Sequence, residues 1–326
     1  MQPKVSVCCT TYNHERYLKR CLDSIVCQKT NFAFELLVFE DCSKDGTRKI
    51  LEEYASKYPD IIIPLYQEEN RYSKDIHVCE NFVFPLVRGE YVALCEGDDY
   101  WTDEYKLQKQ VDALDRNPQC NFCTHRVELV GDKEESLNDS LPRINGKLKG
   151  RKIGEWGGVL SPEETISLGY MHTTSYMMRT AMLKKYLSTQ LYKGADVFDV
   201  PILNYFVQLG DSYYFDQPMS CYRCARIGNW TQNHNAHTHG ESMLDLIERI
   251  DQYFERKWTV ALDKYRFEEK ILVCFANGSF SELKGKRWKK YINQLTNKKL
   301  RIKIKLEHAF PWLIKLVNKI KGKGKK

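Results

Sequence analysis

The fold of this chain is decided by residues 91–101, which read YVALCEGDDYW. The run 91–95 is apolar and is bounded by two glycines, which is typical of a buried β-strand. Three carboxylates, Glu96, Asp98 and Asp99, follow within four residues. Crowded carboxylates repel one another and lose hydration, so packing alone gives no reason to gather them here. A divalent cation gives one, because Mg²⁺ and Mn²⁺ prefer hard oxygen ligands; a solvated acidic turn is the alternative.

The residues before this stretch alternate between the patterns of strands and helices. Apolar runs typical of strands occupy residues 5–9, 34–39, 61–66 and 91–95. Apolar residues at helical spacing occupy residues 14–27, 46–58 and 81–87. Strands separated by helices predict a mostly parallel sheet with helices on both faces. In such sheets ligands bind at the carboxyl ends of the strands, where residues 10–14, 40–45 and 96–101 fall.

The rest of the chain carries weaker patterns. Residues 131–160 are polar and predict a mobile loop or a β-excursion, and residues 226–240 predict a polar loop. Ordered segments are expected at 161–168, 172–179, 181–187, 201–209 (a helix) and 213–215 (a strand). Two further helices are expected at 241–256 and 264–277.

Charge is divided unequally along the 326 residues. Residues 283–326 hold 16 lysines and arginines against one acidic residue, Glu307, which is a net charge of +15. Residues 1–282 carry a net charge of −8. An anionic partner is therefore expected to bind the C-terminal segment. Within it, residues 298–306 alternate apolar and basic side chains, which predicts a strand, and residues 313–320 predict a short helix with one apolar face.

We expect residues 298–326 to lie on an anionic membrane surface, because each Lys or Arg near anionic lipid contributes about 1 kcal/mol to binding. A disordered, solubilising terminus is the alternative. We recognise no nucleic-acid-binding motif, so no nucleic acid is expected as a partner. No secretion signal precedes the first strand, and no apolar run approaches the ~20 residues that span a bilayer. The chain is therefore expected in the cytoplasm, on the inner face of the cell membrane.

The twelve cysteines fit that compartment as free thiols. Two pairs, Cys120 with Cys123 and Cys221 with Cys224, have the two-residue gap of a zinc knuckle, but 97 residues separate them. Because that separation is not the spacing of a zinc ribbon, structural zinc is not expected.

Residues 40–47, which read EDCSKDGT, join a predicted strand to a predicted helix. One of Asp41, Ser43 and Asp45 could simply cap the helix. Capping does not account for all three. A carboxylate at this edge of a sheet can also accept a hydrogen bond from a nucleobase, and the nearby helix N–H groups suit an anion.

With these motifs in this order, the chain resembles the family 2 glycosyltransferases of the GT-A fold. The resemblance rests on residues 5–7 with 11–13, on 40–47 and on 96–101, and it covers residues 1 to about 231. Residues 102–110, TDEYKLQKQ, resemble the branch that builds bacterial surface polysaccharides. The resemblance implies an α/β fold, with a Rossmann-like, mixed and mostly parallel sheet between two layers of helices.

The resemblance also implies a division of the chain. A catalytic domain is expected over residues 1–240, with a nucleotide-sugar-binding half at 1–118 and an acceptor-side half at 119–240. Residues 241–326 are expected to form a helical extension that ends in the basic tail.

The resemblance assigns the donor site as well. The residues expected to bind the nucleotide sugar are Thr11, Tyr12, Asn13, Asp41 (which reads the base), Ser43, Glu96, Gly97, Asp98 and Arg223. Asp98 and Asp99 are expected to bind the metal, Mg²⁺ or Mn²⁺, which stabilises the charge that develops on the leaving β-phosphate. Arg226 is the alternative to Arg223 as a phosphate contact. The chain departs from the family at Glu96, where Asp is usual, and at Ala225, where His is frequent.

On the acceptor side, the family places a catalytic base before a helix that starts at a proline. The match puts this role on Asp199, with Asp196 as the second choice. On local grounds Asp199 is equally explained as the N-cap of that helix. The resemblance also places Trp101, His172, Thr173 and Trp230 on the acceptor side; for His172 a hydrogen-bonded structural histidine is the alternative.

Taken together, the resemblance implies an inverting, metal-dependent glycosyltransferase. It would move a sugar from a nucleotide diphosphate, with a UDP-sugar preferred, to a hydroxyl of a glycan or lipid-linked glycan acceptor. The rival is a non-catalytic GT-A-fold protein that binds nucleotides and is recruited to the membrane by its tail. Glu96 and Ala225 favour the rival, whereas Asp98, Asp99 and Asp199 favour the enzyme. A nucleotidyltransferase would need a glycine-rich and basic triphosphate loop, which we do not find.

Overall fold

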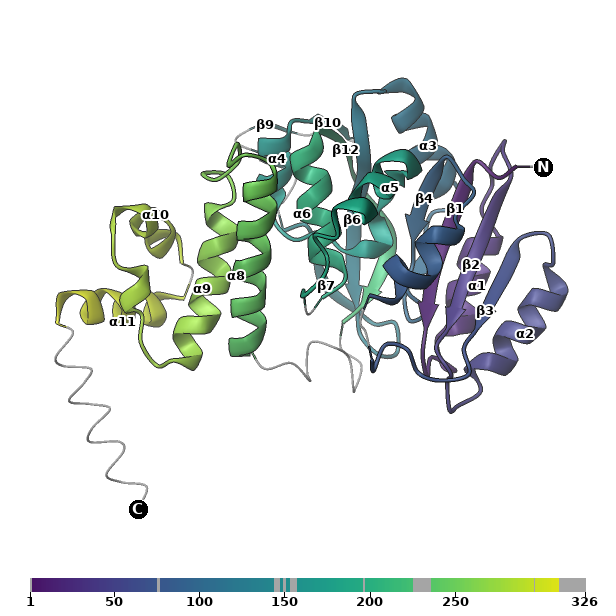
Figure 1. Cartoon of the computed structure of the whole chain (residues 1–326), viewed down its shortest axis with the longest axis horizontal. Helices are drawn as coiled ribbons and strands as arrows, with labels where there is room; N and C mark the ends of the chain where they lie inside the picture. Colours follow the sequence, from purple (N-terminus) through teal and green to yellow (C-terminus); the bar gives the residue numbers. More distant parts are fainter. Residues whose placement is uncertain are drawn as a thin grey trace, which may run out of the picture. The chain divides into compact units, whose positions relative to one another are not determined.

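The computed structural model describes residues 2–74, 77–143, 147–148, 151–152, 157–195, 197–224, 236–295 and 297–310. The chain divides into two compact units, Met1–Gln232 (unit 1) and Asn233–Lys326 (unit 2) (Figure 1). The boundary between the units follows Gln232, whereas the sequence predicts a boundary after residue 240.

The N-terminal half of unit 1 is a parallel sheet. The four predicted strands are confirmed as β1 Val5–Thr11, β2 Phe34–Glu40, β3 Ile62–Tyr66 and β4 Tyr91–Leu94. Strand β1 pairs in parallel with β2 and with β4, and β2 pairs in parallel with β3. Residues of β1 and β4 are buried on both faces, which explains why these strands are continuous apolar runs.

Helices lie against both faces of this sheet, as predicted (Figure 1). One face is covered by α1 Leu18–Val26, α2 Thr47–Lys57 and α3 Lys106–Arg116, which share one buried core. Residues 79–86 and 199–209 pack against the other face, where Phe82 contacts Phe39 and Phe206 contacts Phe122. The helix expected at 81–87 is irregular: a π-helix, η1 (Cys79–Val83), is followed by a 3₁₀-helix, η2 (Phe84–Leu86). Pro85 lies in η2 and has no N–H to donate, which accounts for the loss of regular α-helix here.

The second half of unit 1 makes the sheet mixed. Its strands are β5 Tyr100–Trp101, β6 Cys120–Val130, β7 Ser136–Leu141, β10 Gly158–Leu160, β11 Met177–Arg179 and β12 Asp211–Arg223. The order along the sheet is β10-β12-β6-β11-β4-β1-β2-β3. Strand β11 is antiparallel to β4, and β12 is parallel to β6. Two short strands, β8 Lys147–Leu148 and β9 Arg151–Lys152, pair with each other, so a β-excursion within 131–160 is confirmed.

Strand β12 is much longer than the predicted strand at 213–215. Its pairing with β6 is interrupted by register shifts on both sides of Pro218. A proline removes one ladder hydrogen bond, and the shifts break the apolar alternation that sequence reasoning depends on. The extra length matters because it brings Arg223 beside the acidic turn after β4.

The second half of unit 1 also contains helices among its described residues. They are α4 Pro162–Leu168, the 3₁₀-helix η3 Thr173–Ser175, α5 Thr180–Thr189 and α6 Asp199–Leu209. Helix α4 begins with a capping box between Ser161 and Glu164. The helix predicted at 201–209 is confirmed, and it starts two residues earlier than expected.

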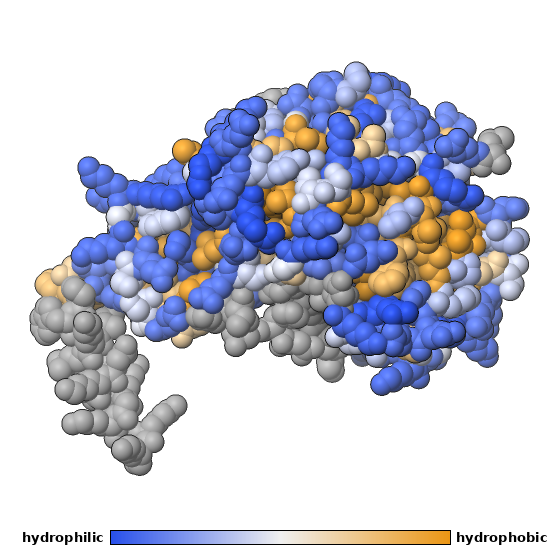
Figure 2. All heavy atoms as spheres, viewed as in Figure 1, coloured by the Kyte–Doolittle hydropathy of each residue, from blue (hydrophilic) through white to orange (hydrophobic). Residues whose placement is uncertain are grey.

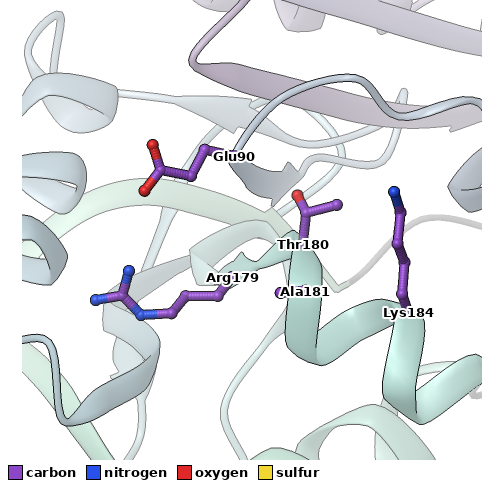
Figure 3. A pocket seen from close by; sticks show the side chains of 5 residues that line it. All are labelled: Glu90, Arg179, Thr180, Ala181 and Lys184. Atoms are coloured by element: carbon purple, nitrogen blue, oxygen red, sulfur yellow. The ribbon is translucent and has the colours of Figure 1, made fainter.

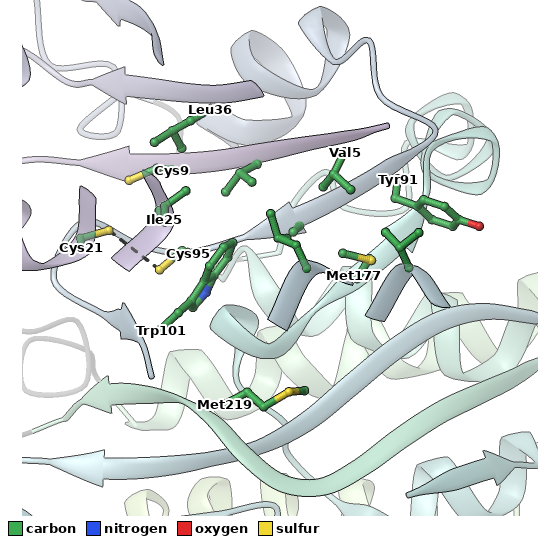
Figure 4. Close-up of a cluster of buried hydrophobic side chains, with 14 of the residues drawn as sticks. Val5, Cys9, Cys21, Ile25, Leu36, Tyr91, Cys95, Trp101, Met177 and Met219 are labelled. Carbon is green, nitrogen blue, oxygen red and sulfur yellow. Dashed lines mark hydrogen bonds between the residues drawn. The ribbon is translucent and has the colours of Figure 1, made fainter. Parts of the chain in front are cut away.

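The main core of unit 1 lies between the sheet and helices α1 and α3 (Figure 4). Side chains from strands far apart in the sequence meet there, among them Val5, Leu36, Tyr91 and Met177. In the space-filling view, orange apolar side chains also gather on the surface over the N-terminal strands (Figure 2). Phe82 and Leu86 are exposed apolar residues of unit 1.

Unit 2 is helical. Its elements are α8 Ala236–Tyr253, α9 Asp263–Ala276, the 3₁₀-helix η4 Ser281–Leu283, α10 Lys286–Gln294 and α11 Lys298–Ala309. Helices α8 and α9 pack side by side (Figure 1), and the helices predicted at 241–256 and 264–277 are confirmed. Among the described residues, we find no helix with the length and apolar character that a membrane span requires.

The strand predicted at 298–306 is wrong, because these residues form helix α11. The helix is started by Asn297, whose side chain accepts a hydrogen bond from the N–H of Leu300. Within the helix, Ile304 is fully buried while Ile302 is 56% exposed. The alternation therefore places apolar residues on two faces of a helix rather than on one face of a strand. The helix predicted at 313–320 lies outside the described residues.

Candidate functional site

The predicted carboxylates lie in a tight turn at the carboxyl end of β4. The N–H of Gly97 donates to the carbonyl of Thr10, and the N–H of Asp99 donates to the carbonyl of Glu96. A Cβ atom on Gly97 would stand 2.7 Å from Thr11 Oγ1 and 2.9 Å from His14 Nδ1. The turn therefore requires glycine at this position, because any side chain would collide with the loop after β1.

Glu96 and Asp99 meet His172, which precedes η3. One ligand atom from each of these three residues lies within 4.8 Å of the other two, the spacing of a metal site. Asp99 Oδ1 accepts the backbone N–H of Arg223 at 2.9 Å, and Glu96 Oε1 accepts the hydroxyl of Thr173 at 2.5 Å. The second oxygen of each carboxylate, Glu96 Oε2 and Asp99 Oδ2, is buried without a hydrogen-bond partner.

These unpartnered oxygens fit a divalent cation. A buried acceptor without a donor is costly unless a proton or a cation satisfies it. His172 Nδ1 accepts the N–H of Thr174 at 3.4 Å and lies 3.5 Å from Asp99 Oδ2. Asp99 Oδ2 therefore faces a second acceptor and has no donor of its own, and a cation beside it satisfies this oxygen. Of the predicted metal pair, Asp99 belongs to this group and Asp98 does not; Asp98 Oδ1 lies 3.9 Å from His14 Nδ1.

Burial shifts the pKa of Glu96, Asp99 and His172 in the direction that favours the neutral form of each. It raises the pKa of Glu96 to about 7, with Asp98 and Asp199 adding repulsion. Burial also raises the pKa of Asp99 well above its usual range, with further contributions from Asp98 and Glu96. Burial lowers the pKa of His172 to about 3, so the imidazole is neutral near pH 7 and has a lone pair for a metal.

Asp199 reaches this cluster from the first position of α6. Its Oδ2 accepts the hydroxyl of Tyr170 at 2.6 Å, and its Oδ1 accepts the N–H of Val200 at 3.0 Å. It is close enough to Glu96 to raise the pKa of that carboxyl. The N-cap interpretation of Asp199 is wrong, because the N-cap residue of α6 is Phe198. Asp196, the second choice for the base, lies outside the described residues.

Two aromatic residues support the site. The ring of Tyr222 stacks on His172 with centroids 3.8 Å apart, and the ring of Tyr170 stands edge-on to His172 at 6.3 Å. Sequence reasoning missed Tyr170. The only available signal was its position two residues before His172, which is too weak to assign a contact to Asp199, 29 residues later.

The loops after β1 and β2 are joined to each other by predicted site residues. The N–H of Asn13 donates to Ser43 Oγ at 3.0 Å, and Asn13 Oδ1 accepts the N–H of Lys44 at 2.8 Å. Asn13 has φ 53°, a left-handed conformation that asparagine tolerates better than most residues. Thr11 is buried and Tyr12 is half-buried in the same loop. Asn13 and Ser43 thus shape the two loops, and contact with a nucleotide stays a prediction.

Asp41, at the end of β2, holds a third loop. Its Oδ1 accepts the N–H of Arg71 at 2.6 Å, and its Oδ2 accepts the N–H of Tyr72 at 3.0 Å and the amide of Asn70 at 2.9 Å. Burial raises its pKa. The loop after β3 therefore belongs to the candidate donor site, although the sequence did not indicate it. Whether Asp41 reads a base stays a prediction.

Arg223 is buried and holds the acidic turn in place, a role that the sequence did not predict. Its side chain is 2% exposed, and its guanidinium donates to the carbonyls of Asp98, Gly131 and Asp132. It also bonds Glu134 Oε1 at 3.2 Å. These contacts tie the acidic turn to residues 131–134 and use four of the five guanidinium N–H donors. A contact from Arg223 to a phosphate stays a prediction. The alternative phosphate contact, Arg226, lies outside the described residues.

The acceptor-side role predicted for Trp101 is wrong. Trp101 is 3% exposed and lies in the main core, among side chains from α1 and β4 (Figure 4). Its ring is 4.0 Å from the ammonium of Lys106, which is itself fully buried and bonds Gln110. Thr173 and His172 do lie at the site, whereas Trp230 and Ala225 are outside the described residues.

A separate cavity of about 360 Å³ lies at the other end of β4, lined by Glu90, Arg179, Thr180, Ala181 and Lys184 (Figure 3). The guanidinium of Arg179 is directed away from it, toward the carbonyls of Leu114 and Cys120. Because this cavity lies at the amino end of the strand and lacks the carboxylate cluster, we do not assign the chemistry to it.

Comparisons with known proteins agree with this geometry. The family described as Glycosyl transferase family 2 matches residues 6–186, more than half of the chain. An uncharacterized protein of Mycobacterium tuberculosis is 36% identical over 178 residues, which are 54% of this chain and 46% of that protein. The putative teichuronic acid biosynthesis glycosyltransferase TuaG of Bacillus subtilis is 35% identical over 113 residues, which are 35% of this chain and 42% of TuaG. The chain spans about half the length of these curated relatives.

Among solved structures, S. aureus TarS 1–349 in complex with UDP-GlcNAc superposes with a TM-score of 0.57 and 19% identity. The match covers 89% of this chain and 79% of the TarS chain, and it shows that the two share a fold. The order of strands, the acidic turn and the family match lead to one conclusion: this chain belongs to glycosyl transferase family 2 and has the GT-A fold.

Proposed function

We propose that this chain is an inverting, metal-dependent glycosyltransferase that moves a sugar from a nucleotide diphosphate to a hydroxyl of a glycan acceptor. The observation that carries the proposal is the position of Asp199, whose Oδ2 accepts the hydroxyl of Tyr170, while the ring of Tyr170 stands edge-on to His172 of the metal group. A transfer by single displacement needs a base beside the group that holds the diphosphate. Glu96 and Asp199 are about a hundred residues apart in sequence, so the fold is what brings their segments together.

In this proposal, Glu96, Asp99 and His172 hold the cation. Two carboxylates and a neutral imidazole suit Mn²⁺ well, whereas Mg²⁺ prefers an all-oxygen shell. When bound, the cation supplies positive charge that stabilises the departing diphosphate.

Asp199 serves as the general base. Its carboxylate takes the proton from the acceptor hydroxyl as that oxygen attacks the anomeric carbon, and the bond from this carbon to the diphosphate oxygen breaks. Tyr170 donates to Asp199 Oδ2, and the N–H of Val200 donates to Oδ1, so the carboxylate is held in one orientation. One displacement inverts the configuration at the anomeric carbon.

The relatives support a class of donor and acceptor. TarS has been solved with UDP-GlcNAc, TuaG is named for teichuronic acid biosynthesis, and a poly(ribitol-phosphate) β-glucosyltransferase of Bacillus spizizenii is 29% identical over 106 residues. We therefore propose a UDP-sugar as donor and a surface polysaccharide, in lipid-linked form, as acceptor.

We further propose that residues 298–326 hold the enzyme on the anionic cytoplasmic face of the cell membrane. The support is the net charge of +15 over residues 283–326 and the lipid-linked acceptor proposed above.

Asp199→Asn tests the proposed base. We expect transfer to fall by about 10²–10⁴-fold, because the acceptor proton then has no acceptor group, while donor binding with Mn²⁺ is unchanged. Transfer is measured with a labelled UDP-sugar, and donor binding by calorimetry. Asp60→Asn, a change at an exposed turn, is the matched control and should transfer normally.

Normal transfer by a folded Asp199→Asn variant would place the base elsewhere. Failure of the unaltered chain to hydrolyse or transfer any nucleotide sugar in the presence of Mn²⁺, together with nucleotide binding, would favour the scaffold protein instead.

A further inference from the structure

Helix α11 of unit 2 has a second apolar face that nothing in the described part of unit 2 covers. Ile302 and Leu306 are four residues apart, so they lie on one side of the helix, and Phe310 is the C-cap residue that follows its last turn. They are 56%, 54% and 47% exposed. Single exposed apolar residues are ordinary on protein surfaces, but two on one helix face together with a third at the C-cap form an apolar stripe at this end of unit 2.

The opposite face holds the helix in place. Ile304 is fully buried in the core of unit 2, and Leu300 packs against the same core. Glu307 Oε1 accepts the N–H of Phe280 and the hydroxyl of Ser279, both at 2.7 Å. Because this inner face is anchored, the stripe of Ile302, Leu306 and Phe310 is presented on a fixed helix.

The charges around the stripe have one sign. Five cations stand on α11: Lys298, Lys299, Arg301, Lys303 and Lys305. Glu307 is the one acidic residue after residue 282 and is 5% exposed, so it does not offset them at the surface. Among the described residues, none of the five cations forms an ion pair.

The basic residues around one cavity of unit 2 are ion-paired instead. A cavity of about 260 Å³ is lined by Arg256, Arg266, Lys270 and Arg287, among other residues. Each of these four is paired with a carboxylate, from Glu248, Asp251, Glu282 and Asp263 respectively. That cavity is electrically balanced, so an anionic partner is expected at α11 and not there.

We propose that the outer face of α11 docks on an anionic lipid surface, with Ile302, Leu306 and Phe310 at the level of the headgroups and the flanking lysines against lipid phosphates. An apolar stripe rimmed by unpaired cations is the pattern of a helix that lies in a membrane interface. A protein partner with an acidic groove or a second copy of this chain would be a different occupant. The charge of one sign favours lipid, because two copies of this face repel each other. The inference rests on the membrane association proposed above and makes it specific to one surface.

The experiment compares full-length variants in their binding to vesicles. Ile302→Gln with Leu306→Gln removes most of the stripe and leaves Leu300 and Ile304 in place. We expect at least about tenfold weaker co-sedimentation with phosphatidylglycerol-containing vesicles, because the apolar contribution is lost. Tyr253→Gln with Val260→Gln removes two apolar side chains of unit 2 that are 51% and 72% exposed, and should bind as the unaltered chain does.

A second set of variants tests the charges. Lys298→Gln, Lys299→Gln and Lys305→Gln together are expected to weaken binding by about fivefold for each lysine removed. The control, Lys184→Gln with Lys185→Gln and Lys193→Gln, removes three exposed lysines of unit 1 and should have little effect. Binding should also fall with rising salt and on vesicles of phosphatidylcholine alone.

Each result decides the inference. Circular dichroism and donor hydrolysis should be unchanged in all variants, which separates loss of docking from loss of folding or of the proposed activity. Equal vesicle binding by the stripe variant and the unaltered chain overturns the inference. So does a stripe variant that loses self-association, or capture of an acidic protein, while it still binds vesicles. A chain that docks through the stripe but transfers no sugar leaves the inference standing and refutes the proposed function.

Discussion

His172 is fixed from three directions by its neighbours. Tyr222 stacks on its ring, the N–H of Thr174 donates to Nδ1, and Asp99 Oδ2 lies 3.5 Å from the same nitrogen. The sequence suggested an acceptor-side residue or a structural histidine. The structure supports a third interpretation, in which the neutral ring completes a metal site with Glu96 and Asp99.

Three variants distinguish this set of ligands from the pair that the sequence predicts. Asp99→Asn and His172→Gln should each weaken Mn²⁺ binding by about 10-fold or more, because each removes a ligand. Asp98→Asn should weaken it less, since Asp98 is not part of the group. Binding is measured by electron paramagnetic resonance of free Mn²⁺, and thermal melts confirm folding. If Asp98→Asn abolishes binding and the other two do not, the predicted pair Asp98 and Asp99 is favoured.

Lys106 is a buried lysine, and its effect on the free energy of unfolding depends on pH. It is fully buried between Trp101 and Gln110, and burial lowers its pKa to about 7. In the unfolded chain the pKa is near 10.5, so between about pH 7 and 10.5 the unfolded state binds one more proton than the folded state. The free energy of unfolding should therefore rise with pH across this window.

The test compares the unaltered chain with Lys106→Met by urea unfolding at several pH values. The methionine fills a similar volume without a charge, so it should be more stable at pH 7, and the difference should shrink as the pH approaches 10. A constant difference would mean that Lys106 stays charged in the folded state, stabilised by the ring of Trp101.

At the scale of elements, α11 shows where a sequence period can mislead. Apolar residues at every second position are typical of strands, yet residues 298–306 are helical. Val, Ile and Leu give the same apolar pattern in a strand and in a helix, so the residues that pack against the segment decide which of the two is formed. Here the core of unit 2 takes Leu300 and Ile304, while Asn297 caps the helix.

The two isoleucines of α11 give a matched pair of variants. Ile304→Ala should lower the free energy of unfolding of unit 2 by about 2–4 kcal/mol, because it opens a cavity in a packed core. Ile302→Ala, on the exposed face, should change it by less than about 0.5 kcal/mol. The measurement is urea unfolding followed by the fluorescence of tryptophan. Equal effects of the two changes would contradict the helical register, because a strand would place both side chains on one face.

At the scale of the whole molecule, the N-terminal half could be predicted well and the second half poorly. Strands β1, β2 and β4 are buried on both faces, so their apolar runs show directly in the sequence. The long strand β12 was missed because Pro218 interrupts its pairing, and the burial of Arg223 and Trp101 depends on partners far away in the sequence. Sequence reasoning predicted those parts of the candidate site that lie within a single motif at the end of one strand, such as the acidic turn after β4. The contacts of His172, Tyr170 and the 70–72 loop required the fold.

All described residues of the candidate site belong to unit 1, and this leads to a prediction for the molecule as a whole. A UDP-sugar with Mn²⁺ should slow hydrogen exchange in the loops after β1, β2, β3 and β4, because ligands that bind the folded state stabilise the segments they order. Exchange in residues 236–310 should not change. The Asp99→Asn variant should lose the Mn²⁺-dependent part of the protection and keep the packing of unit 2. Protection that appeared in unit 2 alone would mean that the nucleotide binds there, and it would remove the basis for placing the donor beside the acidic turn.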